Sequence, residues 1–242
     1  MNGKRTALIT GANKGIGYET ARQLGQRGMT VLIGARDPAR GARAVETLQG
    51  EGIDARPLKL DVADPGSITQ SASRIERDLG RLDVLVNNAG IILGRPNPSA
   101  TQLDDLRRVF EVNVFAAVAV TNAMLPLLRR ASPAARIVMV SSELGGFSNH
   151  GDPKWKYAWF NAIAYPASKA ALNMVTVQYA KELAGAGIKV NAADPGYTST
   201  DLNGHRGTQT VEEGARASVK LALLDEAGPT GGFFNAHGPV PW

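Results

Sequence analysis

Residues 6–17 read TALITGANKGIG, an apolar run followed at once by three closely spaced glycines. The run TALIT is typical of a buried strand, and Gly11, Gly15 and Gly17 predict a tight turn that leads into a helix. The first glycine permits the turn, the second lets the backbone come close to a ligand, and the third lets the helix pack against the sheet. The spacing is not that of a P-loop, because no Gly-Lys-Ser/Thr sequence closes it. The stretch predicts the first strand–turn–helix unit of an α/β protein.

The rest of the chain repeats this alternation of short apolar runs with stretches suited to helices. The expected strands are residues 6–10, 30–35, 55–60, 83–87, 136–141, 188–193 and 231–235. The expected helices lie near residues 15–27, 38–50, 65–79, 101–130, 162–185 and 210–224. Several strands are continuously apolar, as strands covered on both faces are. The alternation predicts a single doubly wound α/β domain spanning residues 1–242, with a seven-stranded parallel sheet and helices on both faces.

Composition and charge narrow the class of protein. The 242 residues include no cysteine, which excludes disulfides and thiolate chemistry and fits a cytoplasmic protein. The net charge of +5 is spread evenly: residues 1–121 hold 16 Lys/Arg against 13 Asp/Glu, and residues 122–242 hold 11 against 9. Such a spread does not form the basic patch of a nucleic-acid-binding protein. The longest apolar stretch, residues 114–120, is too short to cross a bilayer, and because a strand is expected from Thr6 onward we expect no signal peptide. We expect neither a nucleic-acid nor a membrane partner.

The glycine loop has the position that a dinucleotide site requires. In a doubly wound fold the ligand binds outside the carboxyl ends of the strands, where the strand order reverses, and a helix N-terminus there favours phosphate groups. We interpret residues 10–17 as a dinucleotide-binding loop; the alternative is a glycine-rich turn without a ligand. A Ser–His–Asp hydrolase is not indicated, because G-x-S-x-G is absent and no motif accompanies His150, His205 or His237. No ligand spacing indicates a metal site.

Residues 165–169 read YPASK and place a phenol and an ammonium four positions apart. Proline is tolerated in the first turn of a helix, so Tyr165 and Lys169 would project from one face, one turn apart. A tyrosine with a pKa of about 10 is a weak acid at neutral pH, and lowering that pKa by about 3 units takes roughly 4 kcal/mol. Lys169 could supply part of this in a partly dry site. Taken alone, the pair could equally be two surface residues at a helix start.

The motifs, taken in their order, resemble those of the short-chain dehydrogenase/reductase family over essentially the whole chain. The matching elements are TGxxxGxG at residues 10–17, NNAG at 87–90, Asn113 in EVNVF, Ser142 after the fifth strand, YxxxK at Tyr165 and Lys169, and PGxxxT at 195–200. GANKGIG, GARD and the C-terminal tryptophan look closest to the NADPH-dependent carbonyl reductases. The resemblance implies a Rossmann-type fold and the reversible reduction of a ketone or aldehyde to an alcohol. The alternatives are a non-catalytic dinucleotide-sensing protein and an NAD-dependent alcohol dehydrogenase of the same family.

The resemblance also implies a catalytic set of four residues. Tyr165 would donate the proton, and Lys169 would tune the pKa of Tyr165 and bind the nicotinamide ribose. Ser142 would orient the substrate oxygen, and the resemblance favours it over the adjacent Ser141. Asn113 would hold a water that links Lys169 to solvent. The structural alternatives are a polar residue that kinks a helix at Asn113 and a turn at the end of a strand at Ser142.

The family pattern places the cofactor contacts at the ends of several strands. The expected contacts are Gly11, Asn13, Lys14, Gly15, Ile16, Gly17, Arg36, Asp61, Val62, Asn88, Ala89, Gly90, Tyr165, Lys169, Pro195, Gly196, Thr198 and Thr200. Lys14 and Arg36 would flank a 2′-phosphate and so predict NADP(H). Asp37, 20 residues beyond the loop, would instead indicate NAD, but the following Pro38 suggests that Asp37 caps a helix. Asp61 resembles an adenine contact and is otherwise a turn residue.

The substrate side is the least defined part of the sequence. The segment 145–160, longer than in common family members, holds five of the chain's 14 aromatic residues. These side chains either pack on one another or wall a hydrophobic carbonyl pocket. The candidate substrate contacts are Ser142, Phe147, Trp155, Trp159, Tyr165 and Tyr197, and residues 197–212 resemble the family's substrate lid. The same insertion could cover helices 101–130 and 162–185, which relatives use as a subunit interface. We therefore expect a monomer, with a homo-oligomer as the alternative.

Overall fold

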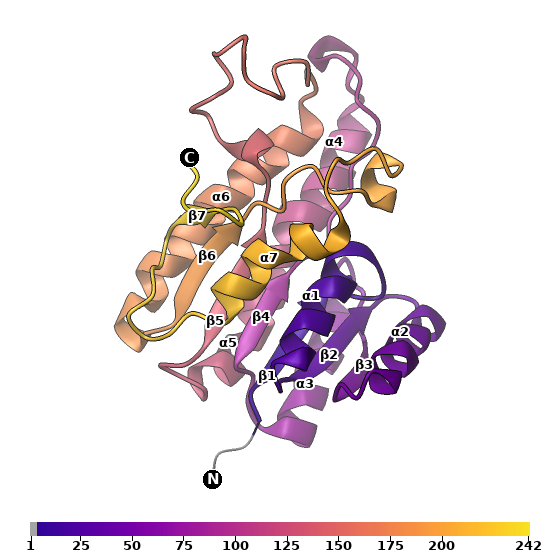
Figure 1. Cartoon of the computed structure of the whole chain (residues 1–242), viewed down its shortest axis with the longest axis vertical. Helices are drawn as coiled ribbons and strands as arrows, with labels where there is room; N and C mark the ends of the chain where they lie inside the picture. The colour runs from indigo at the N-terminus through magenta and orange to yellow at the C-terminus, as the bar shows by residue number, and fades with distance from the viewer. Residues whose placement is uncertain (1–3) are drawn as a thin grey trace.

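The computed structural model describes residues 4–242, and its strands form one central parallel sheet (Figure 1). The strand order is β3-β2-β1-β4-β5-β6-β7. The strands are β1 (Thr6–Thr10), β2 (Thr30–Ala35), β3 (Ala55–Lys59), β4 (Val84–Asn87), β5 (Arg136–Val140), β6 (Lys189–Ala193) and β7 (Phe233–Phe234). The order reverses between β1 and β4, which both pair in parallel with their neighbours. The predicted seven-stranded doubly wound sheet is confirmed.

Helices cover both faces of the sheet because alternate strand residues point to opposite sides. On one face Ala7 and Ile9 pack with α1 (Gly15–Gln26), α2 (Pro38–Gly50) and α7 (Val211–Ala222). On the other face Leu8 packs with α3 (Pro65–Leu79), α5 (Ala116–Arg129) and α6 (Ala164–Leu183). The result is a three-layer domain with one apolar core on each side of the sheet. Short helical turns complete the chain: η1 (Pro98–Ala100), η3 (Glu143–Gly145), η4 (Ala184–Ala186) and η5 (Asp201–Asn203).

Two aspartates cap the helices that follow β2 and β3. Asp37 accepts hydrogen bonds from the backbone N–H of Ala39 at 2.9 Å and of Arg40 at 3.1 Å. Asp64 accepts one from Gly66 N–H at 2.9 Å. Both caps satisfy N–H groups that a helix start leaves unpaired. The sequence-based interpretation of Asp37 as a helix cap is confirmed.

The predicted single helix over residues 101–130 is wrong in its middle. The structure divides it into α4 (Leu103–Phe110), a π-helical turn η2 (Glu111–Phe115) and α5. A π-helical turn is rare and often marks a functional site. The 27-residue run Leu103–Arg129 is long and apolar enough to cross a membrane by composition, but half of its most apolar window is buried inside the protein. The apolar residues of α5 are explained by that packing against α3 and the sheet.

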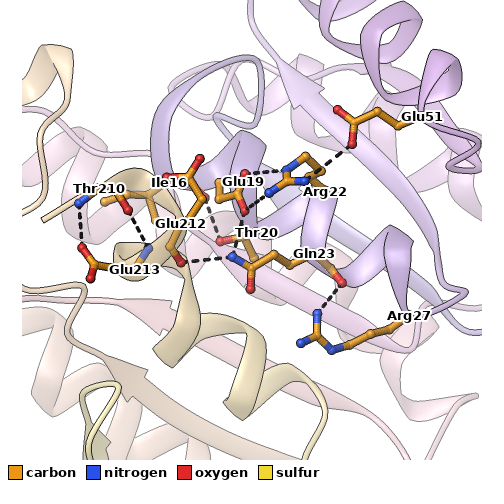
Figure 2. Close-up of polar contacts among 10 residues, drawn as sticks. All are labelled: Ile16, Glu19, Thr20, Arg22, Gln23, Arg27, Glu51, Thr210, Glu212 and Glu213. Carbon is orange, nitrogen blue, oxygen red and sulfur yellow. Dashed lines mark hydrogen bonds and ion pairs between the residues drawn. The ribbon is translucent and has the colours of Figure 1, made fainter.

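A polar network joins α1 to the start of α7 (Figure 2). The buried Glu19 accepts a hydrogen bond at 2.8 Å from Gln23 Nε2, which also donates to the carbonyl oxygen of Glu212 at 3.0 Å. Thr210 and Glu213 form a capping box, with bonds of 3.0 and 3.3 Å between backbone N–H and side chain. These contacts hold the start of α7 against α1, the helix that follows the glycine loop.

Candidate active site

The glycine loop and the end of β4 meet at the point where the strand order reverses. Thr10 Oγ1 accepts hydrogen bonds from the backbone N–H of Asn88 and of Ala89, both at 2.9 Å. Asn88 Nδ2 donates to the carbonyl oxygen of Thr10 at 2.8 Å. A Cβ added to Gly17 would lie 2.4 Å from Asn88 Nδ2, so only glycine lets α1 come this close. The predicted contacts Gly11, Gly17, Asn88 and Ala89 therefore lie together.

The start of α1 has the features of an anion site. No side chain caps this helix, whereas Asp37 and Asp64 cap α2 and α3. The N–H groups of its first turn remain available to phosphate oxygens. A cavity of about 540 Å³ opens beside it, lined by Asn13, Lys14, Tyr18, Arg40, Arg43, Ala44, Thr47 and Asp201. The free helix start and the three cations fit the phosphates of a dinucleotide.

The cations of this cavity differ in part from those predicted. Lys14 lines it and forms an exposed ion pair with Asp201 in η5, within the predicted lid. Arg36, in the turn before α2, is exposed and is not among the lining residues. Arg40 and Arg43 do line it, and sequence reasoning missed them. Arg40 and Arg43 are three residues apart in the first turns of α2, which places both on one side of the helix. That spacing could have been recognised in the sequence.

Tyr165 and Lys169 are brought together in the first turns of α6, as YPASK predicts. Lys169 is buried, and its Nζ donates a hydrogen bond of 2.7 Å to the carbonyl oxygen of Val140 at the end of β5. That Nζ lies 5.6 Å from the centre of the Tyr165 ring. A Cβ on Gly145 would lie 2.5 Å from the backbone carbon of Lys169, so η3 packs directly on α6. This close approach holds the end of β5 against the Tyr165–Lys169 pair.

The two adjacent serines at the end of β5 have different surroundings. Ser141 is buried and donates a hydrogen bond of 2.5 Å to Asn173 Oδ1 on α6. Ser142 lines a second cavity together with Tyr165, and its hydroxyl lies close enough to the phenol to lower the pKa of Tyr165. Its Oγ also accepts a bond of 3.2 Å from the N–H of Leu144. Ser141 thus joins β5 to α6, and Ser142 is the serine that can reach a bound substrate.

The pKa of Tyr165 is raised in the structure, in contrast to the expected lowering. Burial of the phenol is the largest cause, and the nearby carboxylate of Asp194 adds to it. The nearby Ser142 hydroxyl opposes both by lowering the pKa. The expectation rested on the charge of Lys169, but burial disfavours the phenolate more strongly here. Tyr165 therefore stays protonated at neutral pH.

Lys169 and Asp194 titrate nearer to neutral pH than usual. Burial lowers the pKa of Lys169 from 10.5 to about 8. Burial, and then the charge of Glu143, raise the pKa of Asp194 from 3.8 to about 6. Asp194 Oδ1 accepts a hydrogen bond of 3.2 Å from the backbone N–H of Glu143. Shifted pKa values of this kind cluster at functional sites, and Asp194 was not predicted from the sequence.

Asn113 lies in the π-helical turn and joins three elements. Its Oδ1 accepts from Ile91 N–H at 2.8 Å, and its Nδ2 donates to Ile91 O and to Ser168 Oγ, both at 3.0 Å. It therefore fixes the loop after β4 to α6. A Cβ on Gly90 would lie 3.3 Å from Asn113 Oδ1 and 3.7 Å from Lys169 Nζ, so these three residues are neighbours. The proton-relay role of Asn113 stays a prediction.

The second cavity, of about 90 Å³, lies beside Ser142 and Tyr165. It is lined by Ile16, Ile92, Arg95, Ser142, Leu144, Tyr157, Trp159, Phe160, Tyr165, Pro195, Gly196, Tyr197, Thr198, Thr200, Leu202 and Asn203. Ser142, Trp159, Tyr165 and Tyr197 are thus placed where a substrate contact is expected. Phe147 and Trp155 are not among the lining residues: Phe147 is 78% exposed, and Trp155 packs on His150 and Tyr157.

Two pocket aromatics were not predicted as substrate contacts. Tyr157 and Phe160 belong to the segment 145–160, and Tyr157 packs edge-on against Tyr197 at 6.4 Å. This contact joins the insertion to the predicted lid, and both segments lie at the carboxyl end of the sheet (Figure 1). The alternation of aromatic residues from Trp155 to Trp159 could not show which of them face the cavity, because the segment has no regular secondary structure.

The remaining predicted cofactor contacts, apart from Gly15 in the glycine loop itself, divide into two groups. Ile16, Pro195, Gly196, Thr198 and Thr200 line the second cavity, on the side of the glycine loop. Asp61 and Val62 lie in the turn after β3, where Asp61 Oδ1 accepts a bond of 3.1 Å from Ala63 N–H. The two groups lie at the carboxyl ends of different strands, as a dinucleotide that crosses the sheet edge would require.

A glycine loop at the switch point and a Ser–Tyr–Lys set beside it define the class of nicotinamide-dependent oxidoreductases. The family model described as short chain dehydrogenase matches residues 5–210. The chain belongs to this family.

Three relatives illustrate the similarity. The chain is 38% identical over 225 residues to short-chain dehydrogenase anuI of Penicillium roqueforti (strain FM164), covering 90% of this chain and 88% of that one. It is 34% identical to carbonyl reductase [NADPH] 1 of Sus scrofa, covering 98% and 94%. The crystal structure of NADPH-bound carbonyl reductase from chicken fatty liver superposes with a TM-score of 0.87 at 30% identity, covering 99% of each chain.

Proposed function

We propose that the protein is an NADPH-dependent reductase that converts a ketone or aldehyde to an alcohol. The observation that carries the proposal is the placement of Ser142 and Tyr165 in one aromatic cavity, with Lys169 one turn behind. The cofactor supplies a hydride when bound. Ser142 donates a hydrogen bond to the carbonyl oxygen, and Tyr165 gives its phenolic proton to that oxygen. Lys169 holds positive charge near the phenol.

The raised pKa of Tyr165 supports the direction of reduction. Reduction uses the protonated phenol, whereas oxidation of an alcohol needs the phenolate as base. Because burial and Asp194 keep the pKa of Tyr165 above its usual value, the protonated form prevails throughout the neutral range. A non-catalytic dinucleotide sensor would need neither the phenol nor the serine at this position. Consumption of NADPH with a panel of aldehydes, ketones, β-keto esters and quinones tests the proposal, and a panel without turnover would favour the sensor.

The coenzyme preference gives a first prediction. We expect Lys14→Ala combined with Arg36→Asp to lower the ratio of kcat/KM for NADPH over NADH by at least tenfold. A charge-assisted contact to phosphate contributes about 1.5–3 kcal/mol, and the two cations stand near the start of α1 and the end of β2. Arg43→Gln should lower the same ratio, since Arg43 lines the larger cavity. Steady-state kinetics with NADPH and with NADH measures this ratio for wild type and each variant.

Matched variants separate this effect from a general loss of charge. Arg56 lies on the edge strand β3 and pairs with Asp54, so Arg56→Gln should leave the ratio of kcat/KM for the two coenzymes unchanged. A wild-type preference for NADH would make the protein an NAD-dependent alcohol dehydrogenase of the same family. In that case Asp37 would return as the candidate ribose ligand despite its role as a helix cap.

The oligomeric state is a second prediction. The insertion 145–160 lies above the start of α6 (Figure 1), and we predict a monomer in solution. Phe115 on η2 and Met174 on α6 stay 57% and 59% exposed, so the insertion does not cover the whole face of this helix pair. Light scattering at micromolar concentration measures the mass. A stable dimer or tetramer would mean that these apolar side chains are buried against a partner chain.

A further inference from the structure

Arg95 lies in the loop between β4 and η1, and its side chain lines the smaller cavity beside Tyr165. It follows Gly94, which has a φ of +63°, and precedes Pro96. Glycine permits the left-handed conformation before Arg95, and the following proline disfavours a helical backbone at Arg95 itself. The loop therefore presents Arg95 to the cavity in a defined position.

The guanidinium of Arg95 is held by aromatic rings rather than by an acid. Its Cζ lies 5.5 Å from the centre of the Trp159 ring and 5.1 Å from that of Phe160. Within residues 4–242 it takes part in no hydrogen bond and no ion pair. Contact over a ring uses the face of the guanidinium and leaves its N–H groups free to bind a planar carboxylate through two bonds.

No acidic side chain is among the described residues that line this cavity with Arg95. It is the one charged side chain among the described lining residues. Glu143, which lies near Asp194, forms an ion pair of 2.7 Å with Lys156. Asp194 accepts from the backbone N–H of Glu143 and is not a lining residue. An unpaired cation in a partly dry, aromatic cavity favours an anionic ligand.

We propose that Arg95 binds a carboxylate of the substrate, so that the preferred substrates are keto acids with an apolar body. Ser142 and Tyr165 take the carbonyl oxygen, Arg95 takes the carboxylate, and the aromatic walls contact the carbon chain. This inference rests on the proposed reductase function for the carbonyl end of the ligand. The carboxylate site itself is defined by Arg95, Trp159 and Phe160.

Each keto acid is compared with its own methyl ester, so that the carboxylate charge changes while the keto-bearing carbon skeleton stays the same. The substrates are 3-benzoylpropanoate and 4-benzoylbutanoate, each compared with its methyl ester at saturating NADPH. We expect wild type to prefer the acid in kcat/KM by at least tenfold in one pair, as a charge-assisted contact implies. Arg95→Met should lower the acid-to-ester ratio at least tenfold, and Arg95→Lys should lower it less. Arg216→Met removes an exposed cation of α7 and should keep the wild-type ratio.

Binding without turnover gives a second measurement that is independent of reduction. Titration calorimetry compares 4-phenylbutanoate with its uncharged amide on wild type and on Arg95→Met. We expect the acid to bind wild type and to lose at least tenfold in affinity in the variant. Loss of binding in Arg95→Met without reduction of any ketone would support the carboxylate site and contradict the proposed function. Ketone reduction with an acid-to-ester ratio that does not change in Arg95→Met would overturn the inference, and Arg95 would then only clamp Trp159 and Phe160.

Discussion

Tyr165→Phe is expected to lower the turnover number for ketone reduction by about 10³-fold, within the range that general acid catalysis supplies. The substitution removes the phenolic proton and keeps the ring that packs at the start of α6. The affinity for NADPH should therefore change little. Single-turnover absorbance at the NADPH band measures the chemical step, and fluorescence titration measures the affinity. Retention of most of the activity would contradict the assignment of Tyr165 as proton donor.

Tyr179→Phe is a matched control on the same helix. Tyr179 is also partly buried with a raised pKa, and its hydroxyl donates a hydrogen bond of 2.6 Å to Asn122 Oδ1, outside both cavities. Its removal tests the general cost of losing a phenol from α6. We expect turnover close to that of wild type, so that a large loss in Tyr165→Phe belongs to the proton itself.

The pH dependence follows from the direction of the pKa shift of Tyr165. Because the pKa of Tyr165 is raised, its phenol stays protonated through the neutral range, and reduction should first decline when Lys169, whose pKa burial lowers to about 8, loses its charge. Oxidation of the product alcohol should increase as pH rises, since it needs the phenolate. Initial rates in both directions between pH 6 and 10 check the opposite slopes. Equal slopes would mean that another group transfers the proton.

Local sequence patterns predicted the fold and singled out Tyr165 and Lys169, and the family resemblance added Ser142 and Asn113. TALIT and the glycines after it specify a strand and a turn, and Asp37-Pro38 specifies a helix start. The parallel order then brings the ends of β1, β4 and β5 to one edge of the sheet. Ser142 and Tyr165 are far apart in the sequence but meet there, because Ser142 follows β5 and Tyr165 lies at the start of α6.

Features that depend on tertiary packing were not visible in the sequence. The π-helical turn at Asn113 replaces regular helix where that side chain bonds both the loop after β4 and Ser168. The direction of the Tyr165 pKa shift depends on burial and on Asp194, and spacing alone indicated only Lys169. Arg95 carries no motif, and its position over Trp159 and Phe160 arises from two loops without regular structure.

Lys169→Met is expected to lower turnover by about 10²-fold or more and to raise KM for NADPH. The substitution keeps most of the volume of the buried side chain but removes the ammonium that lies 5.6 Å from the Tyr165 ring and would contact the ribose. Steady-state kinetics with varied NADPH separates the two losses. A reduced turnover with an unchanged KM would leave Lys169 as a group that acts on Tyr165 alone.

A measurement of stability against pH shows whether the Lys169→Met substitution simply damages the fold. Burial lowers the pKa of Lys169 to about 8, so the charged form is less favoured in the folded protein than in the unfolded chain. Its contribution to stability is complete above the ordinary pKa of 10.5 and is lost as pH falls through about 8. Between pH 8 and 10 the free energy of unfolding of wild type should thus rise more steeply with pH than that of Lys169→Met, as urea titrations can determine. If the variant is as stable as wild type at pH 7 but slow in turnover, the loss of turnover belongs to the missing ammonium. Equal slopes of stability against pH in the two proteins would instead show that Lys169 is not held in the low-dielectric position beside Val140.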